Sequence, residues 1–111
     1  MQLPSDATLL RVFLGESDRQ GGQLTYEAIV LAARRSGLAG ATVLRGPMGY
    51  GASSHLHTTK VPRLSSDLPV VVEIVDSEEK INAFLPQLDA LMGSGLATLE
   101  KVKVWRYGRR H

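Results

Sequence analysis

The sequence predicts an α+β domain with the element order β-α-β-β-α-β, in which two helices lie on one face of a four-stranded antiparallel sheet. Two segments, around residues 8–14 and 68–76, are extended and apolar on both faces, as buried strands are. Two others, around 25–36 and 76–92, repeat their apolar residues every three or four positions, as helices do. The 111 residues have the length of one domain, so residues 1–111 are assigned to a single unit.

The composition is typical of a soluble globular protein and argues against several classes of function. The chain has no cysteine, which excludes disulfides and zinc–thiolate sites. A net charge of +2 and few aromatic residues argue against nucleic-acid binding. No apolar stretch approaches the roughly 20 residues of a membrane span, and no signal peptide is visible. We therefore expect a cytoplasmic protein that does not insert into membranes.

The first half of the chain should contain a strand, a loop and a helix. Residues 8–14 alternate as a strand does, and 15–23 consist of loop-forming residue types. Thr25 is expected to cap a helix that continues to about Ser36, and Gly37 is expected to end it. The predicted buried face of this helix comprises Tyr26, Ile29, Val30 and Ala33.

The second half should contain three strands and a second helix. The second strand covers about 41–47, and the third covers 68–76. Asp76 and Glu79 have the spacing of a capping box at the start of the second helix. Pro86 should kink or break that helix, and the last strand is expected at about 96–107. The apolar positions of this helix are Ile81, Phe84, Leu85, Leu88, Leu91 and Met92.

This order of elements is that of the ferredoxin-like fold. Both of its helices cover the same face of the sheet. The first and third strands are nevertheless apolar on both faces, whereas a solvated sheet face normally carries polar residues. The second face therefore needs another cover, and we expect copies of the chain to supply it as a closed ring.

A glycine-rich turn follows the second strand. Gly46, Gly49 and Gly51 are more glycines than a plain hairpin needs, and the long loop that follows suggests a function. The Gly49-Tyr50-Gly51 turn could offer N–H groups to an anion while Tyr50 packs on a purine, or it could simply start a hairpin. Arg45 could bind an acidic ligand or pair with a carboxylate across an oligomer interface.

Two histidines in the loop suggest a metal site as a second hypothesis. His55 and His57 face the same way in an extended chain and could share a metal, with Glu16 or Asp18 as further ligands. They could equally be polar loop side chains. No paired carboxylates and no nucleophile arrangement are recognisable, so we expect no enzymatic activity.

The chain resembles a PII-like family known as a domain of unknown function, related to the PII nitrogen regulators and to CutA. The resemblance implies a trimer of ferredoxin-like subunits with ligand clefts between neighbours. The segments that carry it are GESDR at 15–19, LTYEAIVLAAR at 24–34, GLAGATVLRGPMGYGASSHLHT at 37–58, LSSDLPVVVEIVD at 64–76 and GLATLEKVKVWRY at 95–107.

Comparison with PII proteins suggests the kind of ligand. Gly40-Ala41-Thr42 and Gly49-Tyr50-Gly51 match the Gly-x-Thr and Gly-aromatic-Gly pattern of the PII second strand. The PII phosphate loop reads Gly-x-Gly-Lys, whereas here Leu96 follows Gly93-Ser94-Gly95. Arg106 is the one counterpart of the PII arginines that close the site. Because this chain has fewer phosphate-binding charges than PII proteins, the resemblance favours AMP or a cyclic nucleotide over ATP.

Together these features predict a homotrimeric PII-like signalling protein that needs no cofactor. An adenine nucleotide would bind between subunits, and the 50–64 loop would engage a target such as a membrane transporter or channel. The alternative is a CutA-like trimer that binds metal through His55 and His57. The nucleotide-binding residues that the resemblance implies are Thr42, Arg45, Gly49, Tyr50, Gly51, Gly93, Gly95 and Arg106.

Overall fold

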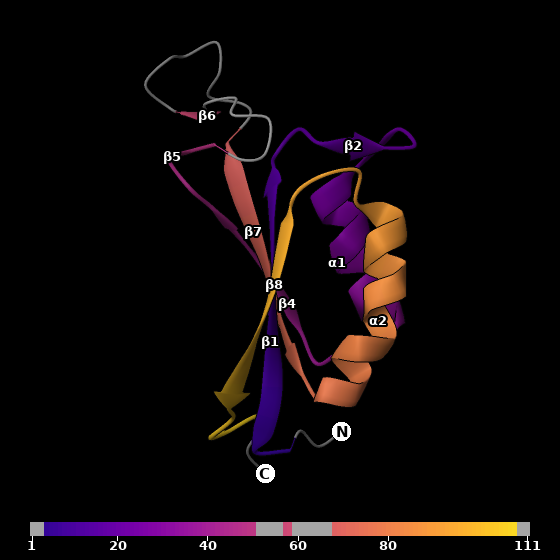
Figure 1. Cartoon of the computed structure of the whole chain (residues 1–111), viewed down its shortest axis with the longest axis vertical. Helices are drawn as coiled ribbons and strands as arrows, with labels where there is room; N and C mark the ends of the chain where they lie inside the picture. Colours follow the sequence, from indigo (N-terminus) through magenta and orange to yellow (C-terminus); the bar gives the residue numbers. More distant parts are fainter. Residues whose placement is uncertain (1–3, 51–56, 59–67, 109–111) are drawn as a thin grey trace.

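Four long strands form one antiparallel sheet, and two helices cover one of its faces (Figure 1). The computed structural model describes residues 4–50 and 68–108, together with the backbone of residues 57–58. Its elements are β1 (Asp6–Gly15), β2 (Arg19–Gln20), β3 (Gln23–Leu24), α1 (Thr25–Arg35), β4 (Ala41–Arg45), β5 (Met48–Gly49), β6 (His57–Thr58), β7 (Pro69–Asp76), α2 (Glu78–Leu91) and β8 (Leu96–Lys103).

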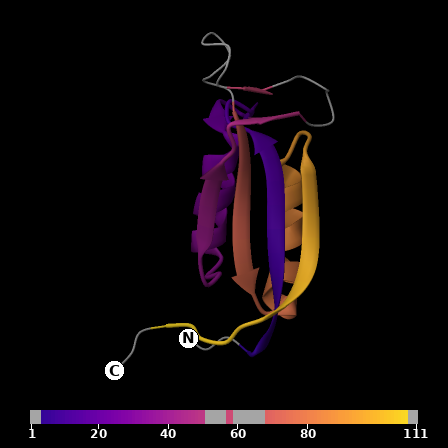
Figure 2. The ribbon, with the colours of Figure 1, turned by 90° about the vertical axis from the view of Figure 1, so that its left-hand side faces the viewer.

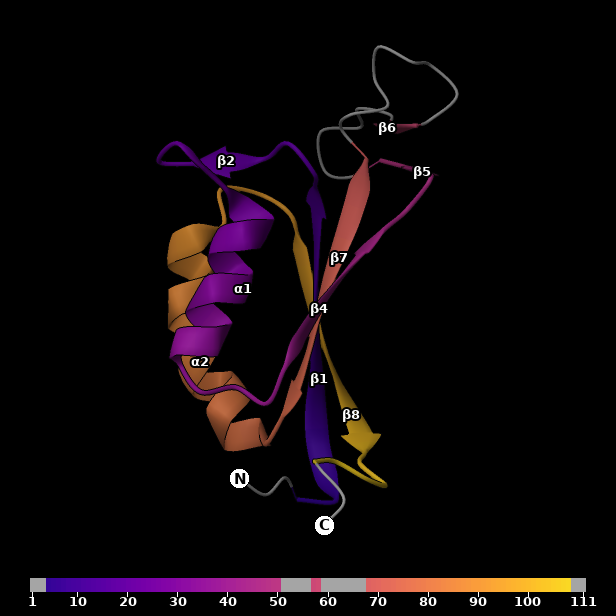
Figure 3. The same cartoon turned by 180° about the vertical axis from the view of Figure 1, so that it is seen from behind.

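The strand order in the sheet is β4-β7-β1-β8, which is the ferredoxin-like order predicted from the sequence. β1 pairs antiparallel with both β7 and β8, so that Thr8 lies between Asp76 and Lys101. The two helices lie on the same side of the sheet when it is viewed from behind (Figure 3). The predicted fold class is therefore confirmed.

The hydrophobic core lies between the helices and one face of the sheet. Leu10 and Val12 of β1 pack in the same cluster as alternate residues of β7 and the apolar positions of α2. α2 continues through Pro86, so the break expected there does not occur. Buried side chains on both sides of the proline hold the helix against the sheet, namely Ile81, Phe84 and Leu88. Neither described helix has the length and apolar character required to cross a membrane.

The start of α1 differs from the prediction. Residues 15–23, expected to be loop, include strand β2, which pairs with β3 in a small hairpin. Its turn residues Gly21 and Gly22 have φ values of 59° and 80°, which suit a tight turn of this kind. Thr25 does not cap the helix: Leu24 holds the cap position, and Thr25 is the first helical residue with its side chain buried in the interior. Burial takes priority over capping at this position.

The start of α2 also differs from the prediction. The cap is Ser77, whose hydroxyl accepts a hydrogen bond from the backbone N–H three residues later. The proposed capping box of Asp76 and Glu79 is therefore wrong. Asp76 is instead buried, and its carboxylate accepts hydrogen bonds from the N–H groups of Ala39 (2.8 Å) and Ser77 (2.6 Å). It thus joins the beginning of α2 to the connection before β4.

Both edge strands are shorter than predicted. β4 ends at Arg45, and β8 ends at Lys103 rather than near residue 107. Residues 104–108, which we call the strap, leave the sheet and cross its lower end toward the β4 side (Figure 2). Two hydrogen bonds hold the strap: Val104 N–H donates to the Ser5 carbonyl at 2.7 Å, and the Tyr107 hydroxyl donates to the Ala39 carbonyl at 2.8 Å.

Within the described part of the chain, no helix covers the face of the sheet away from α1 and α2, and the strap crosses only its lower end (Figure 2). Across its middle, Arg11 Nε donates to Glu73 Oε2 at 2.9 Å, and Arg11 Nη1 lies 3.3 Å from Glu100 Oε1. The hydrogen bond to Glu73, with both negative charges, holds the pKa of Arg11 above its ordinary value. Apolar bands flank this charged row, with Phe13, Leu44, Val71 and Leu96 on one side and Leu9, Val75 and Val102 on the other. We call this surface the open face.

Candidate functional site

The first predicted nucleotide-binding turn, Gly49-Tyr50-Gly51, begins in β5, at the upper end of the sheet in Figure 1. Gly49 belongs to β5, where its backbone pairs with that of His57 in β6. A Cβ added to Gly49 would lie 3.2 Å from the Pro69 ring, so close packing accounts for this glycine. Tyr50 follows and is largely exposed. Gly51 lies outside the described residues.

Arg45 has an acidic partner in its own chain. Its guanidinium forms an ion pair with the carboxylate of Glu16, which follows β1. The pairing considered for Arg45 was with a carboxylate across an oligomer interface, whereas this ion pair lies within one subunit. The Glu16 side chain is mostly buried, and its negative charge offsets the positive charge of Arg45. Arg45 can therefore donate to an anion only through the guanidinium N–H groups that Glu16 does not use.

The second glycine turn connects α2 to β8. Gly95 has a φ of 125°, and a Cβ built there would lie 2.8 Å from the Phe13 carbonyl oxygen. Only glycine fits that backbone and that space. By contrast, a Cβ added to Gly93 would lie 3.3 Å from the amide nitrogen of the Gln20 side chain, which can move aside. The packing of the subunit therefore explains Gly95 without any ligand.

We expect Gly95→Ala to lower the free energy of unfolding by about 2–4 kcal/mol, because backbone strain and overlap with Phe13 add. Gly93→Ala is the matched control two residues away, and we expect a loss below about 1 kcal/mol there. Urea unfolding of both variants measures the difference. Equal losses would contradict the role assigned to Gly95.

The two glycine turns do not meet within one subunit. β4 and β8 are the opposite edges of the sheet, three strand spacings or about 14 Å apart. Arg106 is farther away, since it follows β8, whose eight residues extend about 27 Å from Gly95. A site that used both turns and Arg106 would need contributions from more than one subunit.

The structure does bring Thr42 and Arg106 together. Both line a groove of about 680 Å³ between the strap and the open face. Sequence reasoning missed the other side chains with chemical potential in this groove, because nothing in the sequence shows where the strap turns. The groove is lined by Leu9, Ala39, Gly40, Ala41, Thr42, Glu73, Val75, Val102, Lys103, Val104, Trp105, Arg106 and Tyr107.

The groove combines an aromatic surface, a cation, a hydroxyl and a carboxylate. Trp105 is 93% exposed, which is unusual for so large an apolar side chain. Within the described part of the chain, neither the Arg106 guanidinium nor the Thr42 hydroxyl has a hydrogen-bond partner. Glu73 uses Oε2 to hold Arg11, whereas Lys103 pairs with Asp6 at 3.1 Å. This set suits a small molecule with a flat ring, hydroxyl groups and one negative charge.

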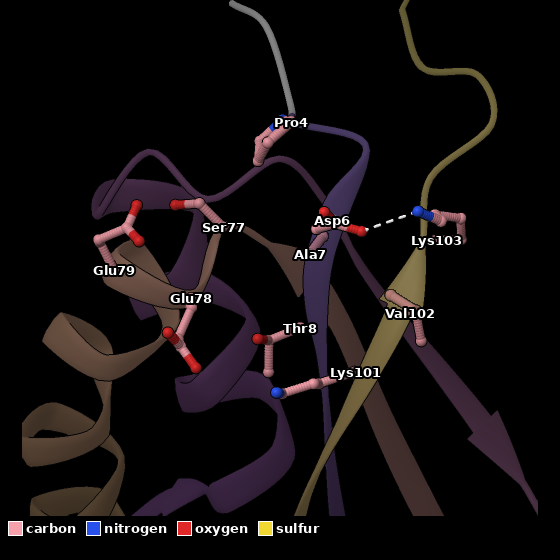
Figure 4. Close-up of a pocket in the computed structure, with 10 residues that line it drawn as sticks. All are labelled: Pro4, Asp6, Ala7, Thr8, Ser77, Glu78, Glu79, Lys101, Val102 and Lys103. Carbon is pink, nitrogen blue, oxygen red and sulfur yellow. Dashed lines mark hydrogen bonds and ion pairs between the residues drawn. The ribbon is translucent and has the colours of Figure 1, made fainter.

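A second cavity, also of about 680 Å³, lies between the start of α2 and the strands β1 and β8 (Figure 4). Thr8 lies at its inner end, and the side chains of Glu78 and Lys101 extend toward this region from opposite sides. The ion pair between Asp6 and Lys103 lies beside them. Charges of both signs are mixed here, and no residue predicted for the nucleotide or metal site lines it.

The predicted metal site falls largely outside the described structure. His55 is not among the described residues, and only the backbone of His57 is described. The other suggested ligands are occupied, because Glu16 pairs with Arg45 and Asp18 accepts a hydrogen bond from the Gly15 N–H at 2.9 Å. Among the described residues, no three His, Asp or Glu side chains form a group that could hold a metal.

Comparison with known proteins gives a family and a solved structure with a similar fold. Residues 7–104 match the model of the family DUF190, described as "Uncharacterized ACR, COG1993". The chain is 44% identical over 96 residues to a UPF0166 protein of Aquifex aeolicus strain VF5, covering 86% of this chain and 90% of that protein. It is 38% identical over 101 residues to a UPF0166 protein of Methanocaldococcus jannaschii, covering 90% and 93%.

Among solved structures, the chain is similar to CPII, a nitrogen regulatory PII-like protein from Thiomonas intermedia K12 that was solved bound to ADP, AMP and bicarbonate. The TM-score is 0.64 at 18% identity, with 91% of this chain and 90% of CPII covered. At this identity the likeness establishes the PII-like fold.

Proposed function

The chain belongs to the DUF190 family, and we propose that it is a PII-like signalling protein that binds an adenine nucleotide and has no enzymatic activity of its own. The observation that carries this proposal is the meeting of Thr42 and Arg106 in one groove. Each was implied by the PII resemblance separately, and they lie far apart in the sequence. CPII, which has the same fold, was solved with ADP and AMP.

The proposed assembly is a homotrimer with its ligand sites between subunits. Its support is the open face, where exposed apolar side chains such as Leu44 and Leu96 need a cover. Glycine turns at opposite edges of each sheet could face one another only across a subunit boundary. The groove would then contribute Thr42 and Arg106, and a neighbouring subunit would contribute backbone N–H groups from its glycine turns.

The charges of the groove favour a ligand with one phosphate. Arg106 is its unpaired cation among the described residues, since Lys103 is engaged by Asp6. Glu73 adds a negative charge to the same groove, and it would repel additional phosphates. We therefore propose AMP as the preferred ligand, with ATP bound more weakly.

The proposed output is a change in what residues 50–64 contact. Gly49 and Tyr50 lead directly into this segment from a site that a nucleotide would touch. A ligand shifts a conformational equilibrium only when it binds one state better, and contact with this turn would supply that difference. The partner would be a membrane transporter or channel, approached from the cytoplasm.

Isothermal titration calorimetry with AMP, ADP, ATP and a cyclic dinucleotide tests the proposal. We expect AMP to bind most tightly, and Arg106→Gln to weaken AMP binding about tenfold or more, as the loss of a charge-assisted hydrogen bond does. Arg34→Gln, on exposed α1 surface behind the sheet, is the matched control. Absence of heat with every nucleotide would contradict the proposal. If metal ions bound instead, with loss in His55→Ala, the CutA-like alternative would replace it.

A further inference from the structure

We propose that Trp105 stacks on the base of the bound nucleotide, and that Glu73 recognises its ribose. This inference rests on the proposed function and specifies which side chains of the groove contact the base and the ribose. Neither residue was implied by the family resemblance. Both line the groove that contains Thr42 and Arg106.

The position of Trp105 argues for a ligand contact. The strap is fastened on both sides of this residue, by the hydrogen bonds of Val104 to Ser5 and of Tyr107 to Ala39. The backbone at Trp105 is thus held beside the groove rather than on a free tail, and the indole itself is 93% exposed. An uncovered aromatic side chain on backbone that is held beside a groove provides a stacking surface, and stacking tolerates any base. Arg106, next in the chain, supplies the positive charge for the phosphate.

The surroundings of Glu73 prepare it for hydroxyl groups. Arg11 holds its Oε2 at 2.9 Å, while Oε1 makes no hydrogen bond within the described part of the chain. The side chain is only 29% exposed, so the carboxylate is both oriented and available. Thr42 lies directly opposite Glu73 in the pairing of β4 with β7, which places a second polar group beside it. A carboxylate that accepts from ribose hydroxyls is the arrangement that dinucleotide-binding proteins use.

The two contacts predict different kinds of selectivity. Stacking on Trp105 adds affinity for any purine or pyrimidine nucleotide. A carboxylate at the ribose should distinguish AMP from 2′-deoxy-AMP, because removal of the 2′-hydroxyl leaves a carboxylate oxygen without its donor. The groove should therefore bind ribonucleotides in preference to deoxyribonucleotides.

Trp105 is the only tryptophan in the chain, so its fluorescence reports on the groove directly. We expect AMP to quench this fluorescence with the same affinity that calorimetry measures on the full chain. Trp105→Ala should weaken AMP binding about tenfold or more, whereas Trp105→Phe, which keeps an aromatic surface, should retain most of it. Light scattering on each variant shows whether its assembly matches the wild type.

Glu73→Gln tests the ribose contact. It should reduce the preference for AMP over 2′-deoxy-AMP, and Glu100→Gln is its matched control. Glu100 also pairs with Arg11, at 3.3 Å, but does not line the groove. We expect Glu100→Gln to leave the preference unchanged.

The outcomes separate this inference from the proposed function. If AMP binds with full affinity to Trp105→Ala and leaves the wild-type fluorescence unchanged, the nucleotide lies elsewhere, and the inference fails while nucleotide binding stands. If Trp105→Ala dissociates the oligomer, the indole is an interface residue and the inference fails. If no nucleotide binds the wild type, the proposed function fails first.

Discussion

Replacing Phe84 with alanine is expected to lower the free energy of unfolding by about 3–5 kcal/mol. The side chain is 1% exposed and lies in the cluster between α2 and the sheet. Its removal loses the transfer free energy of a whole ring and leaves a cavity that rigid neighbours fill only in part. Urea unfolding should show a lower midpoint at an unchanged slope. A loss below about 1 kcal/mol would contradict this packing.

The chain contains one other phenylalanine, and it provides the comparison. Phe13 lies on the open face and is 36% exposed, so Phe13→Ala removes a ring that already contacts solvent. We expect the loss from Phe84→Ala to be the same at all protein concentrations. The loss from Phe13→Ala should grow with protein concentration if copies of the chain cover the open face, because assembly then adds to stability.

The sequence pattern was sufficient to predict the core and the order of the main helices and strands. Phe84 and Leu88 recur at the helical spacing, and Val70, Val72 and Ile74 alternate as one face of a strand does. In both cases the signal extends over many residues and the whole element is buried, so local pattern and tertiary packing agree. Pro86 does not disturb this agreement, because α2 continues through it.

Individual positions at the ends of helices were not predictable in the same way. Thr25 and Asp76 are both good capping residues, yet each is buried and the cap lies one residue away. A pattern of residue types does not show whether a polar side chain at the end of a helix caps the helix or points inward. That choice depends on contacts with the rest of the fold, such as the one between Asp76 and Ala39.

The candidate site was predicted as separate residues rather than as an arrangement. Thr42 and Arg106 were identified from the resemblance, but their meeting depends on the strap crossing the sheet after Lys103. The hydrogen bond of Tyr107 to Ala39 fixes that crossing, and it joins positions that no local pattern relates. For the same reason Trp105 gave no signal beyond its residue type.

Asp76→Ala is the second substitution with a large expected effect. The carboxylate is buried and accepts from two backbone N–H groups, those of Ala39 and Ser77. Removing it leaves both donors without a partner, at about 1–3 kcal/mol each, so we expect a loss of about 2–6 kcal/mol. Lys80, whose Nζ lies 4.0 Å from the carboxylate and bonds to the Gly37 carbonyl, would also lose a countercharge.

The effect of Asp76→Ala should reach the groove as well as the core. Ala39 lines the groove and accepts the hydrogen bond from Tyr107, so loosening its N–H contact should release the strap. Hydrogen exchange should therefore accelerate at the amides of Ala39 and Ser77, and AMP affinity should fall together with stability. Asp6→Ala is the matched control for the loss of stability, because its ion pair with Lys103 is exposed and worth less than about 1 kcal/mol. Equal losses in the two variants would show that the buried carboxylate does not hold this corner of the fold.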